Sequence, residues 1–158
     1  MITALIVVLM IFALAVFFGA PYLPTLKPQA RAALDLLDLK PGQTLLELGS
    51  GDGRVLRQAA RRGIKAVGYE INPILVIVSY IVTFKYRRHV TIKWRNYWRA
   101  DWPQADGIYV FLLDKYMVKL DKKIRRQKPR PPKLASFAWK MPGKKITAEK
   151  DGVYLYSY

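Results

Sequence analysis

The sequence predicts an α/β fold with one open, mostly parallel β-sheet, an antiparallel β-hairpin at its C-terminal end and a hydrophobic N-terminal segment before it. Short apolar runs typical of buried strands alternate with longer segments of helical periodicity. The first apolar run leads into a loop with three alternating glycines. With 158 residues, the chain has room for one domain and little else.

The glycine loop joins a strand expected at residues 45–48 to a helix that begins at Val55. Glycines let the backbone approach a ligand, and a helix N-terminus offers unpaired N–H groups, so this unit suits a nucleotide-like ligand. A dinucleotide fingerprint would need its third glycine one residue later, where Arg54 stands. An acid, Glu47, leads the loop, whose residues are Gly49, Ser50, Gly51, Asp52 and Gly53.

A second acid stands at the end of the next expected strand, at residues 65–69. Glu70 follows Gly53 by 17 positions, and a carboxylate at this place can accept hydrogen bonds from both hydroxyls of a ribose. The alternative is a tight turn with an incidental surface glutamate. Because the loop and the acid each stand at a strand end, the combination favours a binding site over that alternative.

The segment after Glu70 predicts a buried helix over residues 74–84. Asn72 is a suitable N-cap and Pro73 suits the first helical position. The segment is apolar apart from Ser79 and Thr83 and is rich in β-branched residues, so propensity alone would favour a strand. It is too short to span a bilayer.

The remaining elements follow from periodicity and turn residues. A helix is expected at residues 30–39, ended by a turn at 41–42, and the helix after the glycine loop stops at Gly63. The rest are strands at 90–94, 107–113 and 134–139, a basic amphipathic helix at 115–128 between the last two of these, and hairpin strands at 146–150 and 153–158.

The N-terminal segment predicts a membrane anchor. Residues 2–18 are apolar except for Thr3, and no charged side chain occurs before Lys27; a spanning helix needs roughly 20 such residues. A cleaved signal peptide would carry a basic n-region, and a core helix would carry a polar stripe. We therefore expect a transmembrane anchor at residues 1–20, a linker at 21–28 and the folded domain at 29–158, on the cytoplasmic side by the positive-inside rule.

Composition narrows the chemistry and the partners. The net charge of +16 implies an anionic neighbour, which can be nucleic acid, an acidic protein or an anionic membrane surface. The absence of cysteine excludes disulfides, thiolate metal sites and cysteine nucleophiles. The single histidine, His89, stands at the start of an expected strand and favours a structural role, so no metal site is expected.

Several segments together resemble one family. Tyr22-Leu-Pro-Thr25, Glu47-Leu-Gly-Ser-Gly-Asp-Gly-Arg54 and Gly68-Tyr-Glu-Ile-Asn-Pro73 stand behind a hydrophobic N-terminus, and Phe111-Leu-Leu-Asp-Lys-Tyr-Met117 adds a fourth match. The combination resembles the small membrane-anchored, S-adenosylmethionine-dependent protein-lysine methyltransferases that include the mitochondrial enzymes for the ATP synthase c-subunit and the adenine nucleotide translocase. The resemblance implies a Rossmann-like class I methyltransferase fold. It also implies a protein substrate with an accessible lysine near the membrane.

The resemblance also implies a cofactor site for S-adenosylmethionine, with S-adenosylhomocysteine as product. Glu47 and the glycine loop would hold the methionine part, and Glu70 the ribose. Asn96 and Tyr97 would lie by the adenine, and Thr25 would close over the cofactor carboxylate. The family usually has Asp at position 47, and this chain has no room for a helix between its fifth and sixth strands. The full set expected to bind the cofactor is Thr25, Glu47, Gly49, Ser50, Gly51, Asp52, Gly53, Glu70, Asn72, Asn96 and Tyr97.

The sequence leaves alternatives open for the role of Asp114 and for the molecule that accepts the methyl group. Methyl transfer mainly needs alignment and a neutral amine, and Asp114, after the fourth strand, is the carboxylate best placed to assist; its alternative role is a helix N-cap. A nucleic-acid amino methyltransferase usually has an Asn/Asp-Pro-Pro-aromatic motif where this chain has Leu113-Asp114-Lys115-Tyr116. Methylation of RNA, DNA, lipid or small molecules, or a non-catalytic membrane-tethered protein that binds the cofactor, remain alternatives.

The basic helix at residues 115–128 is either a sheet-packing helix with a solvated outer face or a helix that contacts an anionic membrane, and two observations favour the membrane. A linker of roughly eight residues keeps the domain close to the anchor, and Asp121 is the single acid on the outer face of that helix. The cations on that face are Lys119, Lys122, Lys123, Arg125 and Arg126.

Overall fold

The computed structural model describes residues 24–158. The anchor predicted at residues 1–20 lies outside the described residues, as do the first three positions of the predicted linker. The last two linker positions, Lys27 and Pro28, form the start of the first described helix. None of the helices from residue 24 onward is long and apolar enough to cross a membrane.

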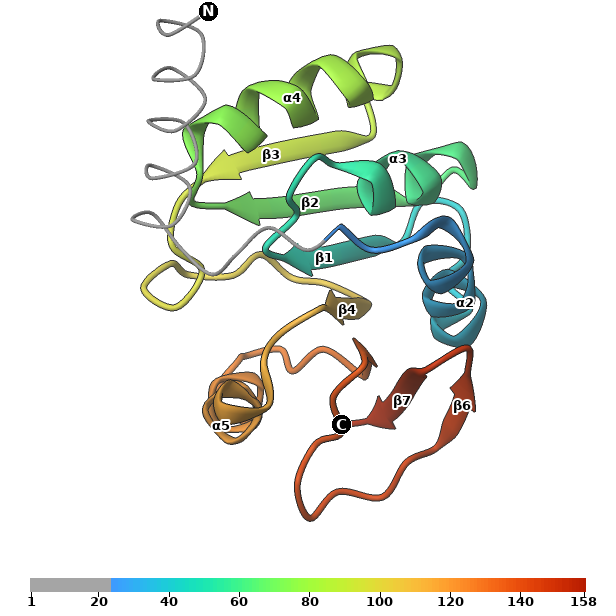
Figure 1. Ribbon diagram of the computed structural model, residues 1–158, viewed down its shortest axis with the longest axis vertical. Helices are drawn as coiled ribbons and strands as arrows, with labels where there is room; N and C mark the ends of the chain where they lie inside the picture. Colours follow the sequence, from blue (N-terminus) through green and yellow to red (C-terminus); the bar gives the residue numbers. More distant parts are fainter. Residues whose placement is uncertain (1–23) are drawn as a thin grey trace, which may run out of the picture.

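The described chain folds around one seven-stranded sheet of order β3-β2-β1-β4-β5-β7-β6 (Figure 1). The first five strands in the chain are parallel, and β7 runs antiparallel to both β5 and β6. The predicted parallel sheet with a C-terminal antiparallel hairpin is confirmed. The strands are β1 (Thr44–Leu48), β2 (Lys65–Glu70), β3 (Val90–Trp94), β4 (Gly107–Val110), β5 (Lys133–Phe137), β6 (Ala148–Lys150) and β7 (Val153–Ser157).

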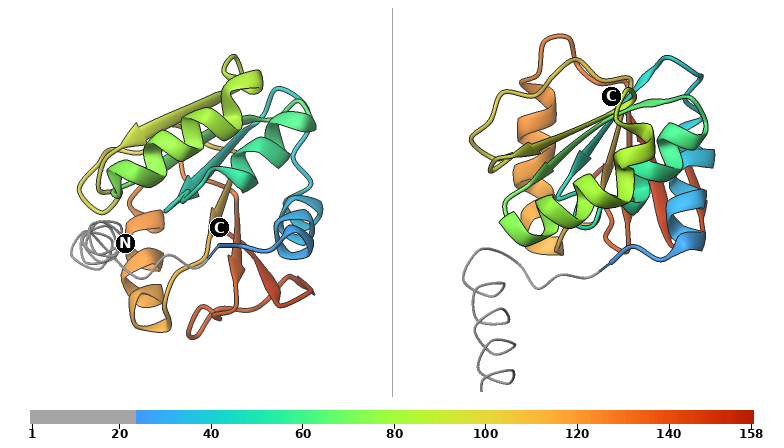
Figure 2. Two further views of the ribbon diagram at one scale, coloured as in Figure 1. Left: turned by 45° about the horizontal axis from the view of Figure 1, so that its top comes forward. Right: turned by 90° about the horizontal axis from the view of Figure 1, so that it is seen from above.

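Helices cover both faces of the sheet (Figure 2). On one face lie α2 (Lys27–Leu37), α3 (Arg54–Arg61) and α4 (Pro73–Thr83), and on the other lies α5 (Met117–Arg125). Each face has its own apolar core: α2 and α3 supply most helical residues of the first, and α5 contributes Met117, Leu120 and Ile124 to the second. Short 3₁₀ turns, η1 (Phe84–Tyr86) and η2 (Asp114–Tyr116), follow α4 and precede α5.

Two element boundaries differ from the sequence prediction in ways that affect the site. The strand expected at residues 107–113 ends at Val110, because β5 pairs with it only as far as that residue. The chain then turns away from the sheet, and the helix expected at 115–128 begins after η2 and spans Met117–Arg125. The hairpin turn is as expected: Asp151 and Gly152 both have positive φ, as a two-residue type I′ turn requires.

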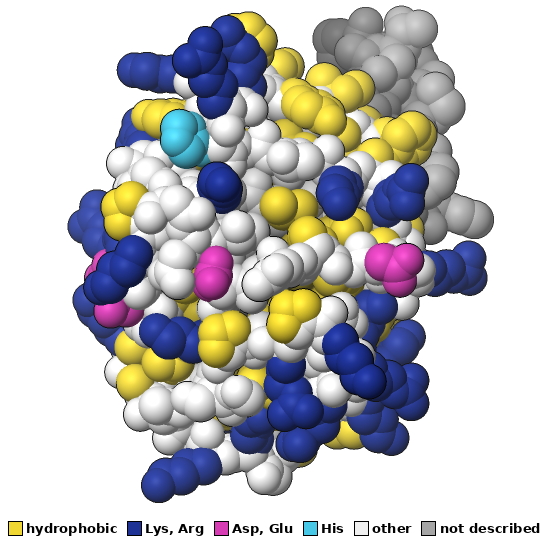
Figure 3. All heavy atoms as spheres, turned by 180° about the vertical axis from the view of Figure 1, so that it is seen from behind, with side chains coloured by type: hydrophobic (Ala, Val, Ile, Leu, Met, Phe, Trp, Pro, Cys, Tyr) yellow, Lys and Arg dark blue, Asp and Glu magenta, His cyan; other side chains and the backbone are white. Residues whose placement is uncertain are grey.

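The basic outer face of α5 is partly engaged by the chain itself. The Lys123 ammonium donates to the carbonyls of Trp98 and Ala100, at 3.2 and 3.1 Å, and burial lowers the pKa of Lys123. The Lys119 ammonium lies 4.3 Å from the centre of the Trp98 ring, and Arg125 pairs with Asp121 at 2.6 Å. On the side opposite to Figure 1, Lys and Arg side chains far outnumber Asp and Glu (Figure 3).

The segment at 74–84 is a helix, as predicted, but it is not buried. Asn72 caps α4 by accepting from the Ile74 amide at 2.9 Å, and Pro73 stands in its first turn. The buried residues of α4 are Val76, Ser79 and Thr83, whereas Ile77 is 60% and Ile81 71% exposed. The prediction of burial was wrong because α4 covers β3, an edge strand, and among residues 24–158 no further element packs on its outer side.

Helix α4 exposes large apolar side chains and buries small ones. The free energy of unfolding should therefore depend little on Ile81 and strongly on Ser79. Ile81→Gln should change the free energy of unfolding by no more than about 0.5 kcal/mol. Ser79 is fully buried against Gly53, so Ser79→Leu should lower that free energy by about 1–3 kcal/mol through overpacking. Urea denaturation of the full-length chain in detergent, followed by circular dichroism, measures both. Equal destabilisation by the two changes would contradict this packing.

Candidate active site

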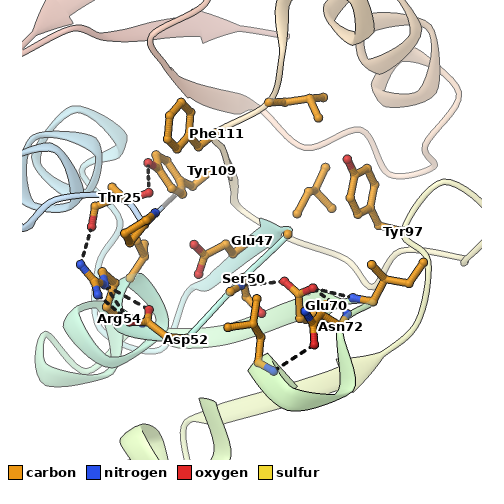
Figure 4. A pocket seen from close by; sticks show the side chains of 18 of the residues that line it. Thr25, Glu47, Ser50, Asp52, Arg54, Glu70, Asn72, Tyr97, Tyr109 and Phe111 are labelled. Atoms are coloured by element: carbon orange, nitrogen blue, oxygen red, sulfur yellow. Dashed lines mark hydrogen bonds and ion pairs between the residues drawn. The ribbon is translucent and has the colours of Figure 1, made fainter. Parts of the chain in front are cut away.

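A pocket of ≈ 330 Å³ opens at the carboxyl ends of β1, β2 and β4 (Figure 4). This edge of a parallel sheet is where ligands bind in open α/β folds. Two predicted residues do not line it: Gly53, which faces Ser79 behind the loop, and Asp114. The predicted residues that the structure brings together on its wall are Thr25, Glu47, Gly49, Ser50, Gly51, Asp52, Glu70, Asn72, Asn96 and Tyr97.

Glu70 fastens the glycine loop to the end of β2. One carboxylate oxygen, Oε2, accepts from the Gly51 amide at 2.8 Å. The other, Oε1, accepts from the amides of Ile71 and Asn72, also at 2.8 Å. The side chain is 7% exposed, so these charge-assisted bonds lie in a largely water-free place, where they hold the loop firmly.

The loop also packs directly against the β2 backbone. The amides of Gly49 and Ser50 both donate to the Tyr69 carbonyl at 2.9 Å. A Cβ on Gly68 would lie 2.6 Å from the Ser50 hydroxyl and equally close to a methyl group of Leu56. Only glycine at position 68 therefore allows the loop to come so close to the strand, and the sequence motif that begins with Gly68 has this physical basis.

Glu47 places a poorly satisfied carboxylate at the base of the pocket. Its side chain is 4% exposed, and within residues 24–158 no hydrogen-bond donor reaches its Oε2. Burial raises the pKa of Glu47 well above its ordinary value, and the negative charges of Asp52 and Glu70 raise it further. A buried acceptor in this state favours a ligand that brings a positive charge or a hydrogen-bond donor.

The segment before α2 is tied across the pocket. The hydroxyl groups of Thr25 and Tyr109 lie 2.9 Å apart. The Arg54 guanidinium donates to the Thr25 carbonyl at 3.2 Å and forms an ion pair with Asp52 at 2.6 Å. Burial raises the pKa of Tyr109, so its phenol stays protonated. Sequence reasoning missed Tyr109 and Arg54; the one available signal was a phenol inside an otherwise apolar strand.

Two asparagines on the pocket wall also shape the backbone. Asn72 caps α4, and the Asn96 Oδ1 accepts from the Trp98 amide at 2.9 Å. This turn places the Tyr97 ring 4.9 Å from the Trp98 ring, and burial raises the pKa of the Tyr97 phenol. The result is an aromatic wall of two tilted rings on the same pocket as the carboxylate of Glu70.

The chain after β4 forms the mouth of the pocket. Its wall residues there, missed individually by sequence reasoning, are Phe111, Leu112, Leu113 and Tyr116. Asp114 is exposed and is the first residue of η2, whose N-cap is Leu113. Because β4 ends at Val110, Asp114 does not line the pocket. The catalytic role expected for Asp114 stays a prediction. Within residues 24–158, no cluster of His, Asp and Glu suits a metal ion.

Comparison with known proteins gives the family. Residues 47–148, which carry the glycine loop, Glu70 and the pocket mouth, match the ANTKMT methyltransferase domain. The chain belongs to this methyltransferase family. The resemblance to the lysine methyltransferases of the ATP synthase c-subunit and the adenine nucleotide translocase is confirmed, whereas the membrane anchor stays a prediction.

Three relatives illustrate the similarity. The human lysine N-methyltransferase of the ATP synthase c-subunit is 32% identical over 109 residues, which are 68% of this chain and 46% of the relative. A protein-lysine N-methyltransferase of Saccharolobus islandicus is 28% identical over 86% of this chain and 92% of its own. An RNA methyltransferase of Salinibacter ruber, solved with S-adenosyl-L-homocysteine, has a TM-score of 0.75 at 26% identity, covering 86% of this chain and 92% of that one. The chain thus spans about half the length of the human relative.

The buried acid at position 47 should make the cofactor-free protein less stable as pH rises. Its raised pKa means that the folded state resists ionisation, so stability falls above pH of about 4.3, where the unfolded glutamate ionises. Glu47→Gln removes this loss and should raise the free energy of unfolding at pH 8 by roughly 1–3 kcal/mol, with a smaller gain at pH 5.

Denaturation at the two pH values measures the effect. Glu149→Gln, on the exposed side of β6, is the matched control and should show no such gain. A variant at position 47 that is no more stable than the wild type at pH 8 would show that its carboxylate is adequately solvated in the folded chain.

Proposed function

We propose that the chain is an S-adenosylmethionine-dependent protein-lysine N-methyltransferase that acts on a membrane-associated protein. The observation that carries the proposal is the pair of buried carboxylates, Glu47 and Glu70, on either side of a glycine loop in a chain of this family. The named lysine methyltransferases among its relatives support lysine as the acceptor.

The pocket residues fit the cofactor. Glu47, with an oxygen that lacks a partner, would hold the ammonium of the methionine part together with the loop, and Thr25 would lie near its carboxylate. Glu70 uses three of its four lone pairs on backbone amides and keeps one, on Oε2, for a ribose hydroxyl. Asn96 and Tyr97 would line the adenine. The S-adenosyl-L-homocysteine in the Salinibacter relative supports the same assignment.

The bound cofactor supplies a methyl group on a sulfonium, which is already a good leaving group. The chain has to align a lysine with it and deliver the amine uncharged. The apolar mouth, which includes Trp98, Phe111 and Tyr116, would strip water from the lysine and so lower its pKa. The proton of the lysine ammonium would pass to bulk solvent as the side chain enters this mouth, so the amine would meet the methyl group of the cofactor uncharged, with S-adenosylhomocysteine as the leaving group.

We place the enzyme on a membrane, with residues 1–20 as a single-pass anchor and the folded domain in the cytoplasm. The run of apolar residues and the absence of charge before Lys27 support this location. The charge of +16 supports contact with an anionic membrane surface. A protein substrate would then present its lysine close to the membrane plane.

Methylation of RNA is the second candidate function. The Salinibacter relative is named an RNA methyltransferase, and the basic surface suits a nucleic acid. Against it, the chain lacks the Asn/Asp-Pro-Pro-aromatic motif of amino methyltransferases after β4, where Leu113-Asp114-Lys115-Tyr116 stands. The radiolabelling experiment described below also tests methylation of lipids or small molecules and a non-catalytic role.

Loss of the Glu70 carboxylate should weaken cofactor binding. A buried hydrogen bond to a charged group is worth about 1.5–3 kcal/mol, so Glu70→Ala should lower the affinity for S-adenosylmethionine roughly ten- to a hundredfold. Calorimetry on the detergent-solubilised full-length chain measures it, with Glu149→Ala as control. Since Glu70 also holds three backbone amides, denaturation of the same variant should show a lower stability. Unchanged affinity would remove Glu70 from the site.

The acceptor should be a lysine of a membrane protein. Membranes from cells that lack the gene, supplied with either the wild-type chain or Glu70→Ala, are incubated with radiolabelled S-adenosylmethionine. We expect label in protein with the wild-type chain only, and mass spectrometry should locate it on a lysine side chain. Label that follows RNA or extractable lipid would favour the corresponding alternative.

A further inference from the structure

The outward face of α4 is apolar from end to end. Ile74, Ile77 and Ile81 of α4 and Phe84, the first residue of η1, follow one another at spacings of three, four and three residues, so they form one line. They are 40%, 60%, 71% and 66% exposed, and Tyr80 beside them is 54% exposed. Helix α4 therefore presents its large side chains outward and packs its small ones inward, the reverse of an ordinary surface helix.

The apolar line continues toward the pocket. Ile71 is 38% exposed and Trp94 is 64% exposed, and the Trp94 indole donates to the Ile71 carbonyl at 3.0 Å. Soluble proteins seldom expose a contiguous apolar surface of this kind without a partner. We call this surface the apolar stripe; its residues are Ile71, Ile74, Ile77, Tyr80, Ile81, Phe84 and Trp94.

Positive charge borders the apolar stripe on the η1 and β3 side. No Asp or Glu occurs between Glu70 and Asp101. The Arg87 guanidinium lies 5.0 Å from the centre of the Phe84 ring, at the edge of the stripe. The basic residues in this interval are Lys85, Arg87, Arg88, Lys93, Arg95 and Arg99.

A second basic region, which we call the basic groove, lies on the α2 and α3 side. Asp52 lines it and Asp35 pairs with Arg62, so positive charge remains in large excess. The Arg57 Nε is buried and has no hydrogen-bond partner within residues 24–158. Val82 of α4 joins the groove to the helix. Its basic residues are Lys27, Arg31, Arg54, Arg57, Arg61 and Arg62.

We infer that the apolar stripe of α4 lies in the interfacial layer of an anionic phospholipid bilayer, with the basic groove on the lipid phosphates. An apolar helical face bordered by Lys and Arg is the pattern of interfacial membrane helices. The inference rests on the membrane location proposed above. Lys27, in the groove, follows the apolar N-terminal segment closely in the sequence.

Other occupants fit less well. Four of the seven stripe residues are isoleucines, which have no π-face for the bases of a nucleic acid, so Tyr80, Phe84 and Trp94 alone could stack on them. A second copy of the chain would bring the basic border of one stripe against that of another, and like charges repel. A bilayer with anionic lipids offers both an apolar layer and negative charge at the depths where the chain has apolar and basic side chains.

This orientation bears on the substrate. Asn72 and Leu75, at the start of α4, line the pocket, so docking through α4 places the pocket beside the bilayer surface. Because α5 lies across the sheet from α4, its basic face would point away from that bilayer. The orientation predicted from the sequence, with α5 on the membrane, is the competing arrangement, and one experiment separates the two.

The absence of cysteine allows a single label at a chosen site. The full-length chain carrying Ile81→Cys or Lys122→Cys is labelled with an environment-sensitive fluorophore and reconstituted into phosphatidylcholine vesicles, with or without phosphatidylglycerol. Both positions are exposed, so the label should not disturb folding. We expect doxyl-lipid quenching at position 81 at least about threefold stronger than at 122 in anionic vesicles, and weaker in neutral ones or after Arg57→Gln with Arg61→Gln.

Each other outcome overturns the inference. Stronger quenching at 122 would place α5 on the membrane. A label at position 81 that is shielded from water but not quenched by lipid would indicate a second copy. Shielding that requires added RNA would indicate a nucleic acid. The readout does not depend on methyl transfer, so a quenched label in a chain without transferase activity would reject the proposed function alone.

Discussion

The hydrogen bonds of the Glu70 carboxylate are the constraint on which the site depends. They join three amides from two different segments, the glycine loop at Gly51 and the turn at Ile71 and Asn72. The same side chain therefore sets the shape of the loop after β1 and the point where α4 begins. Because it is nearly buried, the loss of its charge would affect both segments at once.

The hydrogen bonds of Glu70 hold the glycine loop so that three acidic side chains lie on one pocket wall. Glu47, Asp52 and Glu70 lie near one another, and Arg54 forms an ion pair with the outermost of them, Asp52. The raised pKa of Glu47 is the electrostatic consequence. A pocket lined by buried acids in a basic protein favours a small cationic ligand, while the basic surface around it favours anions, so the proposed cofactor and the proposed membrane partner would be recognised by opposite charges.

The sequence predicted those parts of the fold and site that depend on local signals. The glycine loop, Glu70 at the end of β2 and the Asp151-Gly152 turn each combine residues whose backbone requirements are specific. The burial of α4 could not be predicted in this way, because it depends on β3 being an edge strand. The place of Asp114 likewise depends on where β4 ends, which the pairing with β5 determines. Tyr109 could not be assigned to the site from the sequence, because its hydrogen-bond partner, Thr25, lies 84 residues away in the chain.

The connection between α4 and the pocket gives the inverted helix a functional meaning. The first turn of α4 is fixed by the Asn72 cap, and the amide of Asn72 is itself held by Glu70. The apolar stripe and the cofactor pocket are thus parts of one rigid unit, and a surface that binds α4 also fixes the direction in which the pocket opens. No helix lies between β5 and β6 to build a separate substrate platform, so under the proposed membrane docking the bilayer would position the acceptor lysine relative to the methyl group.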